Sequence, residues 1–132
     1  MNQIEIKATI EKLIDTFLYA GEVSIELREK GLTKEIKEDN TPVSNGDLEV
    51  NRILTEKLLN LTPQIPIISE ETSHNKSKKD LKDFWLIDPI DGTYDYINDL
   101  EEFTLNAGLI INNRAVAGII YAPAKDRLFY SY

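Results

Sequence analysis

Two aspartates that follow an apolar segment are the residues of this sequence best suited to hold a divalent cation. The letters WLIDPIDGT stand at residues 85–93, and their apolar first part predicts a strand that delivers Asp88 to its end. Pro89 prevents the hydrogen-bond ladder of this strand from continuing, which places Asp88 and Asp91 three residues apart on a turn. Carboxylates so placed can share or bridge Mg²⁺, which prefers oxygen ligands and keeps several of its waters.

Gly92 and Thr93, which complete this segment, add groups suited to an anion. Glycine lets the backbone approach a ligand closely, and the amides of both residues would point at an anion if a helix begins at Thr93. A simpler interpretation stays open, in which Asp88 and Asp91 cap local amides of an ordinary Asp-Gly turn.

A second apolar segment also ends in carboxylates. The letters IISEE stand at residues 67–71, so Glu70 follows a short predicted strand. If this strand lies beside the one that ends at Asp88, the two side chains emerge at the same edge and could share a metal ion. The alternative is a solvated acidic loop.

A third segment, TPVSNGD at residues 41–47, admits a structural and a chemical interpretation. Ser44 and Asp47 match the Ser-x-x-Asp form of a capping box, which would begin a helix. In the chemical interpretation, Asp47 accepts a hydrogen bond from Thr93, whose hydroxyl then orients a water on the metal. Both interpretations remain open at this point.

The elements that must position these residues follow from periodicity. Apolar residues at three- and four-residue spacing predict a helix over 6–25, with Gly31 as a stop signal, and a second helix from Ser44 to the Thr62-Pro63 pair. A polar loop containing 76–79 separates the first two strands of a predicted set: 65–69, 84–87, 103–111, 115–121 and 128–132. Two helices followed by mostly antiparallel strands predict an α+β fold.

The amino-acid composition disfavours several classes of site and partner. The 132 residues include no cysteine and one histidine, His74, so thiolate chemistry and histidine-based metal centres are disfavoured. A net charge of −8 argues against a nucleic-acid polymer as partner but not against a small phosphorylated substrate. No apolar run approaches the roughly 20 residues of a membrane span, and the first residues do not resemble a signal peptide. We therefore expect a cytoplasmic enzyme built on carboxylates, hydroxyls and metal.

Together and in this order, the three segments resemble the signature regions of the inositol monophosphatase superfamily of magnesium-dependent phosphatases. The letters DPIDGT at residues 88–93 are its most specific motif. The segments EFTLN at 102–106 and GIIYAP at 118–123 look more like the 3'(2'),5'-bisphosphate nucleotidase branch, and Lys37, Asp39 and the letters TPV at 41–43 lean the same way.

This resemblance implies a role for each matching residue. Glu70, Asp88 and the Ile90 carbonyl would hold one Mg²⁺, and Asp88 and Asp91 would hold a second with an aspartate from the C-terminal half of the family fold. Asp47 and Thr93 would activate the attacking water, with Glu70 also touching water or substrate. The substrate phosphate would contact residues that all lie near the motif: Glu70, Ile90, Asp91, Gly92 and Thr93.

The implied function is a phosphomonoesterase that uses two or three Mg²⁺ ions to remove the 3'-phosphate of 3'-phosphoadenosine 5'-phosphate. The alternatives are an inositol monophosphatase or related sugar phosphatase, and a truncated domain without catalysis. A bare calcium-binding loop is not supported, because the sequence has no Asp-x-Asp-x-Asp-Gly spacing.

The resemblance also implies an architecture and an incomplete family fold. Residues 1–132 would form the N-terminal metal-binding domain of the layered αβαβα sugar-phosphatase fold, with the C-terminal domain absent and an apolar face left open. Two departures from the family pattern stand near the motifs. Gly46 occupies a position that is usually alanine, and the letters YDY at 94–96 replace a segment that often carries lysine and glutamate.

Overall fold

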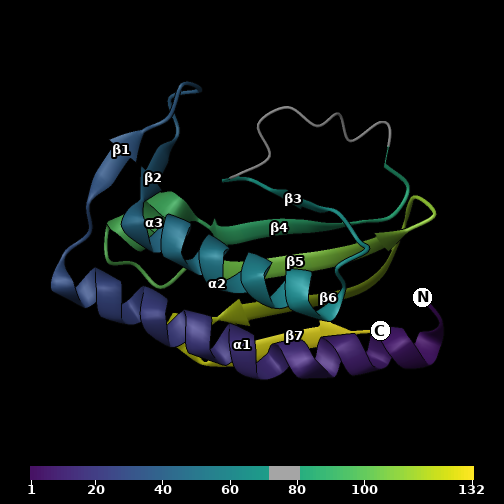
Figure 1. Ribbon diagram of the computed structural model, residues 1–132. Coiled ribbons are helices and arrows are strands. Elements are labelled where there is room, and N and C mark those ends of the chain that lie inside the picture. Colours follow the sequence, from purple (N-terminus) through teal and green to yellow (C-terminus); the bar gives the residue numbers. More distant parts are fainter. Residues whose placement is uncertain (72–80) are drawn as a thin grey trace.

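The computed structural model describes residues 1–71 and 81–132, in which two long helices cover one face of a five-stranded sheet (Figure 1). Helix α1 (Gln3–Lys30) packs on strand β6 and helix α2 (Asn45–Leu61) on strand β4, and the two helices pack on each other. The expected α+β fold, two N-terminal helices on a largely antiparallel sheet, is confirmed. His74 and the polar loop containing 76–79 lie outside the described residues.

The ends of α1 are set by local signals. The Asn2 side chain accepts a hydrogen bond from the Glu5 amide, and the Glu5 side chain accepts one from the Asn2 amide. This capping box starts the helix before residue 6, where we expected it to begin. Gly31 ends it with a positive φ of 96°, a conformation that glycine adopts without a Cβ penalty.

The main sheet has the strand order β3-β4-β5-β6-β7. Its strands are β3 (Ile67–Ser69), β4 (Phe84–Asp91), β5 (Thr104–Ile111), β6 (Arg114–Ala122) and β7 (Arg127–Ser131), with a 3₁₀ turn at Pro123–Lys125. Strand β3 runs parallel to β4, and all other neighbours are antiparallel. A separate hairpin of β1 (Lys34–Ile36) and β2 (Pro42–Ser44) precedes α2.

Strand β4 differs from the expectation in one respect that bears on chemistry. We expected Pro89 to end the strand, but pairing with β5 continues to Asp91, opposite Thr104. The register shifts between Asp88 and Asp91, so the proline falls within an irregularity where its missing N–H is not required by the ladder. The acidic pair therefore lies on a distorted strand end and not beyond the strand.

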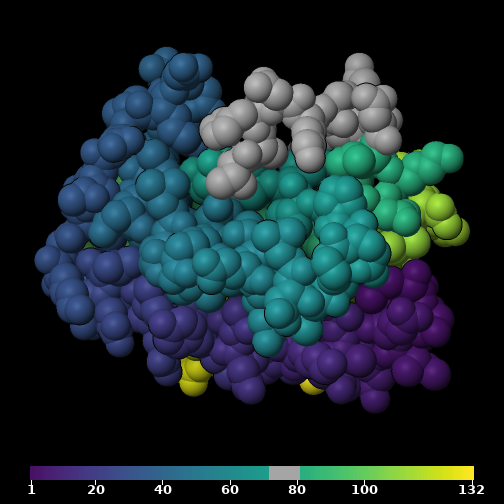
Figure 2. All heavy atoms as spheres, viewed as in Figure 1, coloured from purple at the N-terminus to yellow at the C-terminus, as the bar shows by residue number. Residues whose placement is uncertain are grey.

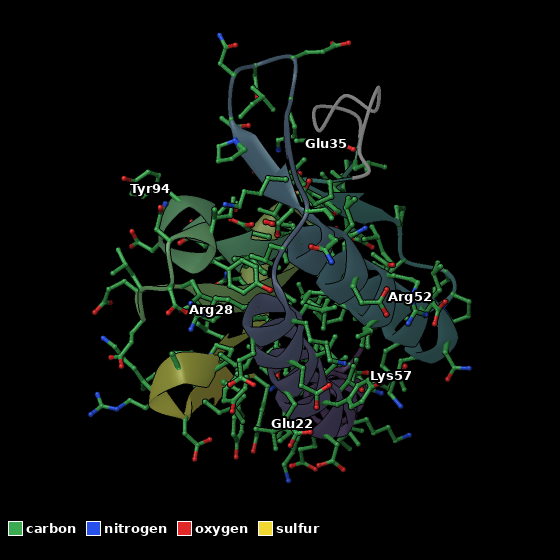
Figure 3. All side chains as sticks on the ribbon, turned by 90° about the vertical axis from the view of Figure 1, so that its left-hand side faces the viewer. Glu22, Arg28, Glu35, Arg52, Lys57 and Tyr94 are labelled. Atoms are coloured by element: carbon green, nitrogen blue, oxygen red, sulfur yellow. The ribbon has the colours of Figure 1, made fainter. Side chains whose placement is uncertain are left out.

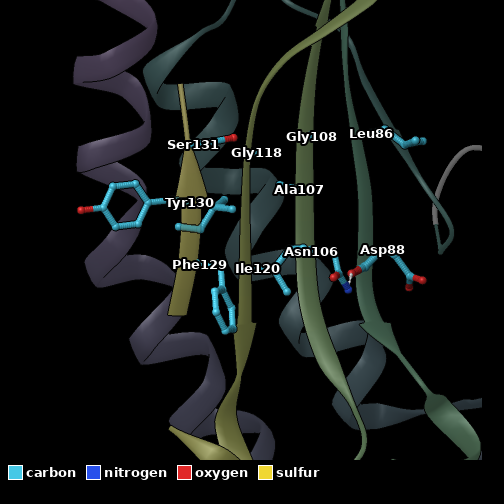
Figure 4. Close-up of a pocket in the computed structure, with 11 residues that line it drawn as sticks. Leu86, Asp88, Asn106, Ala107, Gly108, Gly118, Ile120, Phe129, Tyr130 and Ser131 are labelled. Atoms are coloured by element: carbon cyan, nitrogen blue, oxygen red, sulfur yellow. Dashed lines mark hydrogen bonds between the residues drawn. The ribbon is translucent and has the colours of Figure 1, made fainter. Parts of the chain in front are cut away.

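The two faces of the sheet differ. In Figure 2, α1 and α2 cover the viewed side, and the core beneath them includes the fully buried Trp85, whose indole donates to the Thr62 hydroxyl at 2.9 Å. Figure 4 shows the opposite face, where Ile120 and Phe129 are exposed beside a depression of about 470 Å³. Leu86 is a further exposed apolar residue that lines this depression.

Neither long helix carries an apolar stretch sufficient to cross a membrane, within the part of the chain that the structure describes.

Candidate metal and phosphate site

The Asp47 carboxylate connects the start of α2 to the end of β4. The Thr93 hydroxyl donates to Asp47 Oδ1 at 2.8 Å and lies 3.1 Å from the Ile90 carbonyl oxygen. The other carboxylate oxygen, Oδ2, accepts from the Ser44 amide at 2.9 Å and from the Ser44 hydroxyl at 2.5 Å. Asp47 is fully buried, so its charge is held by donors from two elements. The capping and the chemical interpretations of this residue are therefore compatible.

The parallel pairing of β3 with β4 brings the second acidic segment to the same edge. Ser69 pairs with Ile87, and the Glu70 amide donates to the Ile87 carbonyl at 3.1 Å. Glu70 and Asp88 are thus the next residues along two neighbouring parallel strands. The structure brings both together with Asp91 at one cavity of about 330 Å³.

Asp88 is partly buried and lies among several other carboxylates. Partial burial, followed by the charges of Asp91, Glu70 and the neighbouring Glu71 and Asp47, raises the pKa of Asp88 to about 6. A carboxyl group shifted in this direction binds its proton more tightly than usual, and a divalent cation would relieve the same repulsion.

Gly92 fixes the turn between β4 and the short helix α3 (Thr93–Ile97). Its φ of 85° is left-handed, and a Cβ at this position would lie 2.5 Å from the carbonyl oxygen of Glu102. Only glycine combines this φ with so close a neighbour. A helix does begin at Thr93, and the Tyr96 amide donates back to the Gly92 carbonyl at 2.9 Å.

Lys37 and Glu71 also line the cavity, although the sequence interpretation gave neither a role in the site. The Lys37 Nζ lies 3.8 Å from Glu71 Oε2, and the Glu71 side chain is 5% exposed. Burial raises the pKa of Glu71, while the charge of Lys37 opposes that shift. Glu71 could have been suspected from its place next to Glu70, whereas Lys37 reaches the site through the hairpin of β1 and β2.

The donor set suits a hard cation. Within residues 1–71 and 81–132, no three His, Cys, Asp or Glu side chains form a group that could hold one ion. The ligand sets that the resemblance implies use two carboxylates of this chain for each ion, completed by the Ile90 carbonyl or by a ligand from elsewhere. All of these donors are oxygens, the ligands that hard cations such as Mg²⁺ prefer. The residues present therefore fit the group that the resemblance implies.

Comparison with known proteins matches residues 6–132 to the model of the inositol monophosphatase family. A protein of Aggregatibacter actinomycetemcomitans named 3'(2'),5'-bisphosphate nucleotidase CysQ is 40% identical over 92% of this chain and 46% of its own length. The CysQ of Haemophilus influenzae is 42% identical over 78% of this chain and 39% of its own length. The chain thus spans about half the length of the curated relatives it matches.

Solved structures share the fold. The IMPase of Thermotoga maritima superposes with a TM-score of 0.81 at 24% identity, over 92% of this chain and 47% of its own. An IMPase/NADP phosphatase complexed with Mg²⁺ and phosphate gives a TM-score of 0.78 at 22% identity, over 92% of this chain and 47% of its own.

Proposed function

The chain belongs to the inositol monophosphatase family, and on that premise we propose that it forms the metal-binding part of a magnesium-dependent phosphomonoesterase. One observation carries the proposal. The hydrogen bond from Thr93 to the buried Asp47 lies at the same end of the sheet as the carboxylates of Glu70, Asp88 and Asp91. A hydroxyl held by a buried carboxylate beside a cluster of oxygen donors suits the activation of water for attack on a phosphate ester.

The proposed substrate is 3'-phosphoadenosine 5'-phosphate, which would lose its 3'-phosphate. The relatives at 40% and 42% identity are named bisphosphate nucleotidases, which favours this substrate over inositol monophosphate. The inositol ester remains the second candidate, because solved structures of the same fold include inositol monophosphatases.

We assign the ions to the residues that the family resemblance names. Glu70, Asp88 and the Ile90 carbonyl would hold one Mg²⁺, and Asp88 and Asp91 would contribute to a second. Magnesium bound there lowers the pKa of water and neutralises phosphate charge.

The remaining chemistry belongs to the side chains of this chain. Because the Thr93 hydroxyl donates a hydrogen bond to Asp47, its oxygen is left as an acceptor for a hydrogen of the attacking water. The buried Asp47 charge favours that orientation of the hydroxyl, since the opposite one would set two acceptors against each other. Gly92 allows a phosphate to approach the backbone closely.

The test is release of inorganic phosphate from 3'-phosphoadenosine 5'-phosphate by the purified chain, with Mg²⁺ or with a chelator. The proposal predicts release that requires Mg²⁺, exceeds release from inositol 1-phosphate, and is lost in Asp91→Asn. Faster hydrolysis of the inositol ester would favour the second candidate. A folded chain that binds Mg²⁺ but releases phosphate from neither ester would contradict the prediction of turnover by this chain, and would leave it as the metal-binding part only.

A further inference from the structure

Tyr96 of α3 is held from several sides at the junction of the three helices. Its ring is fully buried, and its hydroxyl donates to the Ser24 carbonyl of α1 at 2.6 Å. The Phe103 ring lies 4.9 Å away between centroids, and the Arg28 guanidinium lies 5.6 Å from the Tyr96 centroid. Figure 3 shows Arg28 reaching from α1 towards this part of the molecule. Tyr96 therefore has little freedom to move.

The first turn of α2 packs directly against the Tyr96 side chain. A Cβ added to Gly46 would overlap the Tyr96 hydroxyl oxygen and would lie 2.7 Å from both Cε2 and Cζ of the ring. Real Cβ atoms do not come this close to their neighbours, so the position admits only glycine as long as Tyr96 stays in place. The contact of Gly46 with Tyr96 thus sets how closely α2 approaches α3.

This contact is adjacent to the hydrogen bond that the proposed chemistry needs. Gly46 directly precedes Asp47, and Tyr96 shares one turn of α3 with Thr93, closed by the Tyr96 amide on the Gly92 carbonyl. The two elements therefore touch at two neighbouring points, one steric and one a 2.8 Å hydrogen bond. A change in the steric contact is therefore expected to alter the hydrogen bond, because Gly46 and Asp47 are consecutive and Tyr96 lies in the same helical turn as Thr93.

We propose that Gly46 and Tyr96 act together as a spacer between α2 and α3, which makes Tyr96 a positioning residue for the Asp47–Thr93 pair. The consequence for turnover rests on the proposed function, whereas the consequence for the geometry of the pair does not. Tyr96 acts through Thr93 and Asp47 and does not itself touch the substrate.

The experiment compares Gly46→Ala, Tyr96→Phe and the double variant of the whole chain. Gly46→Ala is expected to shift the ¹³C resonance of the Asp47 carboxyl and to lower kcat/KM by about 100-fold, the scale of a small misplacement of catalytic groups. Adding Tyr96→Phe removes the overlapping oxygen and frees the ring from Ser24. In the double variant, the Asp47 resonance should return most of the way to its wild-type position, and kcat/KM should rise about tenfold over that of Gly46→Ala.

A matched control separates positioning from general loss of stability. Leu13→Ala removes most of a fully buried side chain on α1, away from this junction, and leaves a cavity. It should therefore lower Tm at least as much as Gly46→Ala. It should leave the Asp47 resonance and kcat/KM unchanged. The proposal is overturned if Gly46→Ala keeps the wild-type resonance, if the control moves it equally, or if the double variant recovers nothing. A wild-type chain without phosphate release would count against the proposed function only, since the resonance still reports the spacer.

Discussion

The Thr93 hydroxyl donates a 2.8 Å hydrogen bond to the carboxylate of Asp47, a residue 46 positions earlier in the chain that is fully buried. This one contact joins the start of α2 to the turn after β4. It also leaves the Thr93 oxygen beside the cavity that Asp88 and Asp91 line. The Asp47–Thr93 hydrogen bond therefore links the packing of these two elements to the proposed chemistry of the site.

Removing the Thr93 hydroxyl should cost stability as well as activity. In Thr93→Val, Asp47 Oδ1 loses its donor while it stays buried, which should lower the free energy of unfolding by about 1–3 kcal/mol. Thr93→Ser keeps the donor and should stay close to wild type. Urea unfolding checks the first effect, and phosphate release checks a loss of about 10²–10⁴-fold in turnover. Equal stabilities of the valine and serine variants would show that the hydrogen bond is not formed.

Any substitution of Gly92 should destabilise the fold, because the added side chain has no room. Gly92→Ala combines a left-handed φ, which costs about 1–2 kcal/mol, with overlap on the Glu102 carbonyl. Asparagine tolerates the left-handed region but carries the same Cβ, so Gly92→Asn should still be destabilised by the overlap, although somewhat less than the alanine variant. Thermal unfolding of both checks this. Rescue by asparagine would mean that backbone strain alone excludes other residues.

The raised pKa of Asp88 predicts a pH dependence of the metal-free chain. Since the pKa of about 6 in the folded state lies above the ordinary value of 3.8, the folded state holds this proton more tightly. The stability that this provides is fully present below about pH 4 and is lost as the pH rises through about 6. With a chelator present, the Tm of Asp88→Asn minus the Tm of wild type should therefore increase from pH 4 to pH 7. A constant difference over this range would contradict the shift.

The helices and their ends could be predicted from the sequence because each depends on a few neighbouring residues. The amphipathic pattern, the Ser44–Asp47 cap and the stop at Gly31 all appear in the structure. Pro89 was misjudged because a proline on a strand is equally satisfied by an irregular register, which depends on the partner strand. The family resemblance, drawn from three segments of which 88–93 is the most specific, is confirmed by the match over 6–132.

The nonlocal contacts could not be predicted in the same way. Sequence alone could not place Asp47 near Thr93 or bring Lys37 to Glu71, because each pair depends on the packing of separate elements. The two departures from the family pattern, Gly46 and the 94–96 segment, lie about 50 positions apart, and the sequence pattern does not connect them. In the structure they touch through Tyr96, so each accounts for the other in steric terms. The roles of the site residues themselves remain predictions.

Titration of Mg²⁺ into the purified chain by calorimetry tests the central claim most directly. Wild type should bind, and Asp88→Asn should weaken binding by at least about tenfold, because Asp88 is assigned to both ions. Asp15→Asn is the matched control, since it removes the same charge from the exposed side of α1. The account predicts an unchanged affinity for this control. Absence of Mg²⁺ binding by the wild-type chain, or equal affinities of the Asp88 and Asp15 variants, would contradict the assignment of this site to the metal.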